Sequence, residues 1–195
     1  MGNPLPPNLK ITKDRMRQLQ ASLEALVKKE ILVGFPQENT DRTDANGNPV
    51  PITNAALGYI HDQGAPEVNI PQREFMKPAI RDVQSTVTTM LGQIARKVVV
   101  NGEDEAFVET GLMRVGQKAE DAIKKKINDG VPPPLSDVTL QHRAARGRVD
   151  AMWALAWRAA GAPPGVDGLE KPLVDTGAMR NAVKYVIRLR SARSK

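Results

Sequence analysis

Two long amphipathic stretches, separated only by Asn101 and Gly102, constrain the fold of this 195-residue chain more than any other feature. The first runs over 77–100 and the second over 103–129, where Gly130 stops it. Apolar residues recur in both at the three- and four-residue spacing of one helix face. The sequence therefore predicts a long hairpin or a bent pair of helices.

The charge pattern of the second stretch also indicates a helix. Acidic residues at 103–105 suit the positive N-terminal end of a helix dipole, and lysines suit its other end. Glu120 with Lys124, and Asp121 with Lys125, are spaced for ion pairs one turn apart. We expect both pairs to support the helix.

Shorter elements are expected on either side of this pair. The stretches 30–35 and 183–189 predict two strands. Short helices, most of them after a capping residue, are expected at 12–29, 54–63, 136–143 and 151–160, with a further turn after Asp175 or Thr176. The predicted class is α+β, with a small, mostly antiparallel sheet packed by several helices, extended loops and terminal arms.

Proline and glycine divide the chain into one domain and two ends. Residues 1–11 are predicted to form an N-terminal arm, 12–190 a single α+β assembly domain, and 191–195 a basic tail. The loop at 36–52 is rich in turn residues and long for a compact domain. We therefore expect it to be functional or to become ordered on assembly.

The excess positive charge lies near the C-terminus. The net charge is +6, and six basic residues with no acidic residue follow Asp175: Arg180, Lys184, Arg188, Arg190, Arg193 and Lys195. Such a tail can neutralise phosphates or dock on an acidic partner. It is equally typical of a solvated C-terminus, so charge alone leaves these alternatives open.

The sequence carries no motif of a catalytic, metal or cofactor site. Cysteine is absent, which removes disulfides and thiolate chemistry and fits a reducing cytoplasm. The two histidines, His61 and His142, lack the spacing of a helical metal pair. No run approaches the roughly 20 apolar residues that span a bilayer. We expect a protein that is not an enzyme, without a cofactor and without a membrane partner.

Trp153 and Trp157 are one helical turn apart, beside Arg158. Aromatic residues interleaved with arginines can stack on nucleic-acid bases. The same pair can pack into a core or a subunit interface, where tryptophan is enriched. Packing is the commoner outcome and is the one that we favour.

Three separated stretches together resemble one family. They are Ile52–Gly64 followed by Ile70–Phe75, then Pro133–Leu140, then Lys171–Arg180 followed by Tyr185 and Val186. Their order and spacing resemble the neck or tail-completion proteins of tailed bacteriophages, often described as virion morphogenesis or minor tail proteins. The family patterns are a helix ending in a histidine–acid–x–glycine turn, an Ile-Pro-x-Arg-Pro-Phe segment, and a Leu-x-Asp-Thr-Gly-x-Leu/Met-Arg turn.

The resemblance implies a structural virion protein, made in the bacterial host cytoplasm and incorporated into the neck or tail. Copies would form a ring around the DNA channel that completes the tail end and joins it to the head connector. Six copies are expected for a tail-completion ring, and twelve for a ring on the portal side. The implied partners are further copies, a head–tail connector or adaptor protein, the tail tube protein and, non-specifically, DNA.

The first stretch has the chemistry of an assembly joint. Pro71 stiffens an extended segment, Phe75 can fill an apolar site, and Arg73 can clamp a carboxylate or backbone carbonyls across the joint. The interface candidates are Arg73, Phe75, Trp153, Trp157, Arg180, Arg188 and Arg190. The loops at 36–52 and 161–170, with both arms, would reach adjacent subunits.

Two other classes of protein stay open. One is a nucleic-acid-binding module that uses the basic C-terminal tail and the segment from Trp153 to Arg158. The other is a small virion-associated hydrolase, for which His61 and His142 would be the residues to substitute.

Overall fold

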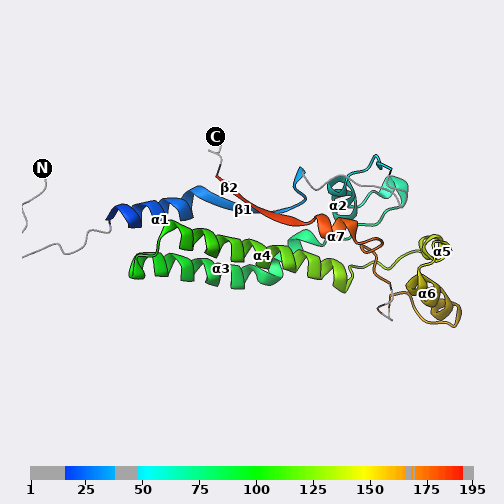
Figure 1. Cartoon of the computed structure of the whole chain (residues 1–195). Helices are drawn as coiled ribbons and strands as arrows, with labels where there is room; N and C mark the ends of the chain where they lie inside the picture. Colours follow the sequence, from blue (N-terminus) through cyan, green and yellow to red (C-terminus); the bar gives the residue numbers. More distant parts are fainter. Residues whose placement is uncertain (1–15, 38–47, 166–167, 169, 191–195) are drawn as a thin grey trace, which may run out of the picture.

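The two long amphipathic stretches fold into a packed helix pair, α3 (Met76–Asn101) and α4 (Glu105–Asp129), which forms the spine of the molecule (Figure 1). The computed structural model describes residues 16–37, 48–165, 168 and 170–190. A two-stranded ribbon lies along the pair, α1 lies at one end, and the remaining helices gather at the other (Figure 1). The predicted α+β class, with a small antiparallel sheet and a long helix pair, is confirmed.

The face of α4 that packs on α3 is the one that its periodicity predicts. All six of its predicted apolar positions are buried: Val108, Leu112, Val115, Ala119, Ile123 and Ile127. Asp104 caps the helix by accepting a hydrogen bond from the Phe107 N–H at 2.9 Å. Gly111 lets the helices approach closely, because a Cβ there would lie 2.6 Å from Ile94.

The ribbon consists of β1 (Lys29–Gly34) and β2 (Lys184–Leu189), paired antiparallel. Ile31 lies opposite Ile187, and both pack against the cluster formed by α1, α3 and α4. On the outward face Glu30 lies opposite Arg188, and their side chains pair at 2.8 Å. Alternation along the strands thus separates a half-buried face that packs on the helices from an outward face that carries this ion pair beside the exposed Leu32 and Val186.

Glu120 and Gly116 fix the ribbon on α4. The Glu120 carboxylate is buried and accepts hydrogen bonds from Lys124 at 2.5 Å and from the Tyr185 N–H at 3.0 Å. Burial alone would raise the pKa of Glu120, but these hydrogen bonds outweigh it and hold the pKa below its usual range. One helical turn earlier, Gly116 leaves room for the Tyr185 ring.

The shorter helices are α1 (Met16–Lys28), α2 (Asn54–Gln63), α5 (Asp137–Ala145), α6 (Val149–Ala159) and α7 (Ala178–Ala182). Thr53 caps α2 and Ser136 caps α5 through their hydroxyls, as the sequence predicts. The start of α7 differs from the prediction, because Gly177 occupies its capping position with a φ of 82°. Thr176 still contributes, since its hydroxyl accepts from the Ala178 N–H.

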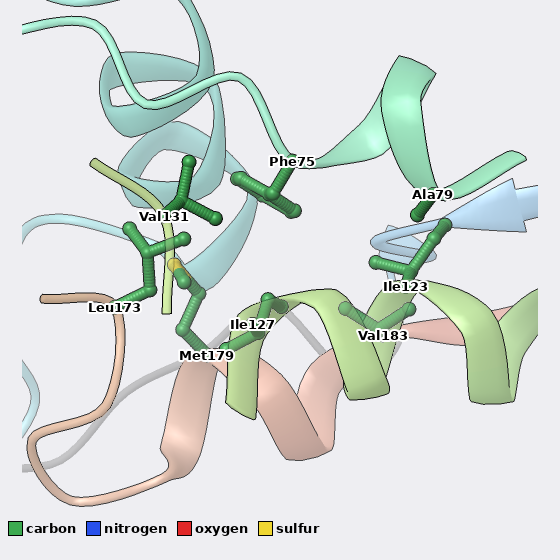
Figure 2. Packing of buried hydrophobic residues seen from close by; sticks show 8 residues of the cluster. All are labelled: Phe75, Ala79, Ile123, Ile127, Val131, Leu173, Met179 and Val183. Carbon is green, nitrogen blue, oxygen red and sulfur yellow. The ribbon is translucent and has the colours of Figure 1, made fainter. Parts of the chain in front are cut away.

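Phe75 lies at the centre of the middle core and is fully buried. Figure 2 shows its ring among side chains from α4, the segment after α4, and the C-terminal region. The cluster consists of Phe75, Ala79, Ile123, Ile127, Val131, Leu173, Met179 and Val183. This core therefore joins parts of the chain that are far apart in sequence, from Phe75 before α3 to Val183 before β2.

The helices α5 and α6 form a small outer module. Its core contains only four buried apolar residues: Leu135, Leu140, Ala151 and Ala154. So small a core contributes little stabilisation by itself. Polar contacts to the rest of the chain must therefore hold the module in place.

Three details differ from the sequence prediction. The segment after Gly64 is not extended throughout, because it makes a short 3-10 turn at Pro66–Val68 closed by a bridge between Ala65 and Ile70. Lys125 pairs with Asp129 instead of Asp121. The predictions for the arm at 1–11, the tail at 191–195 and most of the loop at 36–52 lie outside the described residues.

Gly116→Ala is expected to destabilise the protein, although alanine is the better helix former. A Cβ at this position would lie 2.3 Å from Cδ2 of Tyr185, so the ring and β2 must shift. We expect a loss of about 1–3 kcal/mol in the free energy of unfolding, typical of overpacking. Thermal unfolding followed by circular dichroism measures it.

Gly92→Ala is the matched control. Gly92 also lies inside a long helix, but a Cβ there would meet nothing within 4 Å. We expect this substitution to stabilise the protein by up to about 1 kcal/mol through helix propensity. Equal effects of the two substitutions would contradict the close approach of Tyr185 to α4.

Candidate assembly site

The three stretches that carry the family resemblance meet around one cleft of about 920 Å³. Its walls come from the end of α2, the segment at 66–73, the start of α5, and the segment at 172–179. These segments are separated in sequence by up to about a hundred residues. Their meeting makes the cleft the first candidate for a functional site.

Asp62 turns the first stretch back on itself. Its buried carboxylate accepts hydrogen bonds from the Phe75 N–H at 3.0 Å and the Met76 N–H at 3.1 Å, at the start of α3. The Arg73 N–H donates to the His61 carbonyl at 2.7 Å. Gly64 has a φ of 78°, and a Cβ there would lie 2.8 Å from the Gln72 nitrogen. The histidine–acid–x–glycine pattern is thus a turn that brings residues 61–64 against residues 72–76.

Arg73 joins the first stretch to the second. Its guanidinium is 5% exposed and donates to the carbonyls of Pro133 at 2.9 Å and Pro134 at 3.2 Å. The sequence predicts that Arg73 clamps a carboxylate or backbone carbonyls across an assembly joint, whereas in this structure it binds carbonyls of its own chain. Because prolines lack an N–H, these carbonyls lie in a segment that cannot form a regular hydrogen-bonded ladder.

Arg143, on α5, joins the second stretch to the third. It is 7% exposed and donates to the carbonyls of Lys171 at 3.1 Å, Pro172 at 3.1 Å and Val174 at 3.0 Å. Sequence reasoning did not single out Arg143. The available signal was its position three residues after Leu140, on the buried face of α5.

Positive charge is concentrated in the wall of the cleft. Burial lowers the pKa of Arg73, and the nearby Arg143 charge lowers it further. Burial also lowers the pKa of Arg143, although Asp175 acts in the opposite direction. Asp175 lies 3.8 Å from the Arg143 guanidinium and 3.0 Å from that of Arg146. One carboxylate therefore serves two arginines.

Two further arginines pin the α5–α6 module. Arg158 donates to the buried carboxylate of Glu170 at 2.9 Å and pairs with Asp137. Glu170 also accepts from the Leu135 N–H at 3.2 Å. Arg148 pairs with Asp150 and donates to the Asp175 carbonyl. Since Arg158 is occupied in this way, it is not the free cation beside the tryptophans that base stacking would use.

The other interface candidates lie in different places. Phe75 and Arg73 are buried in the chain itself, so neither side chain is accessible to a partner in this structure. Arg180 donates to the side-chain oxygen of Asn128, and Arg188 pairs with Glu30. The Arg190 N–H donates to the Lys28 carbonyl beside the ribbon. Among the described basic residues that follow Asp175, Arg180, Lys184 and Arg188 therefore pair with three different partners, Asn128, Glu120 and Glu30.

Trp153 and Trp157 lie on the outer side of α6, with 57% and 54% of their surfaces exposed. Of the two packing outcomes that the sequence allows, burial in this chain's own core is wrong. Packing at a subunit interface stays a prediction. The structure therefore separates a clamped cleft from an exposed tryptophan surface, both carried by the α5–α6 region.

No family model, curated protein or solved structure matches the chain. Among the described residues, no group of three or more histidines and carboxylates is placed to hold a metal ion. Within the same residues, none of the helices has the length and apolar character needed to cross a bilayer. Of the two histidines, His61 lines the cleft and His142 lies exposed on α5.

Arg143→Lys is expected to loosen the third stretch. Lysine keeps the charge but lacks the planar fork that reaches three carbonyls, so buried acceptors lose their donors. We expect a loss of about 1–3 kcal/mol in the free energy of unfolding, measured by chemical denaturation.

Arg146→Lys is the control for charge and location. Arg146 lies three residues further on, with 58% of its side chain exposed, and its side chain pairs with Asp175 and the His142 carbonyl. We expect a change below about 0.5 kcal/mol. If both substitutions cost the same, the carbonyl clamp is not what holds the third stretch.

Proposed function

We propose that this protein is a structural subunit of the neck of a tailed bacteriophage. In this proposal, copies form a ring around the DNA channel that completes the tail end and joins it to the head connector. Its partners are other copies of the chain, a connector or adaptor protein, and the tail tube protein. DNA passing through the channel is contacted without sequence specificity.

The observation that carries this proposal is the meeting of the three family-like stretches around one cleft. Stretches chosen from sequence alone have no reason to be neighbours unless they form one structural unit. Here Arg73 ties the first stretch to the second, and Arg143, three residues after the second stretch on α5, ties that helix to the third. These contacts support the proposal, because they join the three stretches into one structural unit.

The distribution of apolar side chains also supports an assembly role. Large apolar side chains are exposed at many places on the described surface, and the four on α6, Val149, Met152, Trp153 and Trp157, lie together on one side of that helix. Monomeric proteins rarely leave contiguous apolar surface uncovered, and such surfaces usually mark interaction sites. The exposed apolar side of α6 therefore suits a subunit that is covered by a partner.

Native mass measurement of the purified protein, alone and mixed with purified tail tubes, tests the proposal. The expected result is a ring of six or twelve times the 21.3 kDa chain mass, formed alone or on the tube. A protein that stays monomeric at high concentration and never joins a tube or connector would contradict it.

A nucleic-acid-binding module is the second candidate, and the exposure of both tryptophans favours it. Half-exposed indole rings are what base stacking requires. Binding to duplex and single-stranded DNA across a salt series separates the two proposals. Sub-micromolar affinity that falls steeply with salt would favour nucleic-acid binding, whereas the neck proposal expects weak binding.

A further inference from the structure

Five exposed cations of the spine have no carboxylate partner in the described part of the chain. They are Arg81, Arg96 and Lys97 on α3, and Arg114 and Lys118 on α4. The other lysines of the two helices each pair with a carboxylate. We call the five residues the spine cations. Cations that are not neutralised within the fold attract anions to the surface that carries them.

Pairing within the fold places excess positive charge on the spine. By composition the excess follows Asp175, and the rest of the chain is neutral. Arg188, however, pairs with Glu30, and Lys184 lies 3.5 Å from a carboxylate oxygen of Glu120. Both carboxylates come from the part of the chain that is neutral by composition. Their use by C-terminal cations leaves that part with an excess of basic residues.

The two spine cations of α4 lie on the side of the helix that faces away from the ribbon. Gly116 and Glu120 hold the ribbon on the other side. Lys118 is two residues from both of them, and Arg114 is two residues from Gly116. Two residues correspond to about 200° around an α-helix. Arg114 and Lys118 therefore project opposite the ribbon.

The spine cations of the two helices adjoin each other. Lys97 of α3 lies over the Phe107 ring of α4, 5.6 Å from its centroid. Phe107, Arg114 and Lys118 are separated by seven and four residues, which places them on one side of α4. Arg96 directly precedes Lys97. The cations of both helices therefore belong to one surface of the pair.

The outer side of α3 is smooth between Arg81 and Arg96. Its exposed residues Ser85, Thr88 and Gly92 follow Arg81 at intervals of three and four residues, and a Cβ at Gly92 would meet nothing within 4 Å. The two arginines are about 22 Å apart along the helix. In Figure 1 the ribbon lies along α4, and no described helix or strand lies beyond α3. A long, straight ligand can therefore reach this side.

We infer that the spine cations bind the phosphate backbone of double-stranded DNA. This inference deepens the proposed function and rests on it for the source of the duplex, which is the DNA in the channel. Arginine, lysine and hydroxyl side chains are usual donors to phosphates, and such contacts fix position without reading sequence. The surface thus suits DNA that passes through the channel.

The side chains of this surface favour a nucleic acid over an acidic protein. Protein interfaces are anchored by large side chains such as tryptophan and tyrosine, whereas hydroxyls and a glycine separate Arg81 from Arg96. Two carboxylates border the surface. Asp82 is paired with Lys126 at 3.4 Å, and Asp121 accepts a hydrogen bond from Gln117 at 2.9 Å. The five cations outweigh the one carboxylate that has no cationic partner.

Binding of the purified chain to duplex DNA across a salt series tests the inference. Arg81→Gln combined with Arg96→Gln removes two of the cations. Each lost phosphate contact reduces the slope of log K against log salt by about 0.9, so the slope is expected to fall by about 2. The affinity at low salt is expected to fall at least tenfold. The unaltered chain is expected to bind two unrelated sequences equally, with a dissociation constant above about 1 μM.

Arg17→Gln combined with Lys171→Gln is the matched control. Both residues are exposed, lie outside α3 and α4, and pair with no carboxylate of the described residues. The net charge of the protein changes by the same amount, yet the affinity is expected to change less than twofold. Equal losses in the two double variants would overturn the inference, because binding would then follow net charge alone. Circular dichroism identifies any variant that fails to fold.

Labelling with an amine-reactive reagent locates the contact on the unaltered protein. Peptide mass spectrometry is expected to show that duplex DNA at low salt protects Lys97 and Lys118 several-fold and leaves Lys171 unchanged. Protection of the two spine lysines by oligoglutamate but not by DNA would overturn the inference in favour of an acidic protein partner. Loss of DNA binding in Trp153→Ala, with the Arg81 and Arg96 variant binding normally, would overturn it in favour of α6.

The inference and the proposed function fail in different ways. Rings that form with tail tubes while DNA leaves Lys97 and Lys118 unprotected would overturn the inference and leave the proposed function standing. A chain that stays monomeric with and without tail tubes, yet shows this protection, would contradict the proposed function and leave the phosphate-binding surface standing.

Discussion

The rest of the structure depends on the way in which Arg143 is buried. Removing a guanidinium from water is costly unless its donors are satisfied, and here three carbonyls of the segment at 171–174 satisfy them. Arg73 repeats the arrangement with the carbonyls of Pro133 and Pro134. Both arginines bind backbone, so the contacts depend on the path of the chain more than on neighbouring side chains. The two clamps hold four separate segments around one cleft.

This arrangement explains how a region with little apolar core can be rigid. The α5–α6 module buries four apolar residues of its own, whereas the spine of α3 and α4 buries a long continuous stripe. Directional hydrogen bonds and the ion pairs of Arg158 position the module where apolar packing cannot. The outer face of α6 is consequently presented at a fixed angle, as an assembly surface requires. The α5–α6 module is thus both held by polar contacts on its inner side and exposed on its outer side.

Apolar periodicity and capping residues predicted most of the helices and strands. They did not predict the contacts between residues that are far apart in the sequence. The period of α4, the caps at Thr53 and Ser136, and the strand at 183–189 each depend on residues within one or two turns, so the sequence displays them directly. The clamp of Arg143 spans about thirty residues to carbonyls that carry no sequence signature. Phe75 was expected to fill an apolar site, and it does, but that site is the core of the same chain. Tryptophan is a large apolar residue that is usually buried, so the sequence favours packing for Trp153 and Trp157. Only the structure shows that more than half of each side chain is exposed.

The central claim is that Arg73 and Arg143 hold the cleft together within one chain, so that α6 presents Trp153 and Trp157 outward, as the proposed assembly role requires. Hydrogen exchange of the isolated and the assembled protein, resolved by peptide, tests this claim most directly. Slower amide exchange is expected at 149–159 on assembly, with little change at 137–145, whose amides are hydrogen-bonded within α5 in the single chain. Unchanged exchange at 149–159, with new protection elsewhere, would contradict this claim.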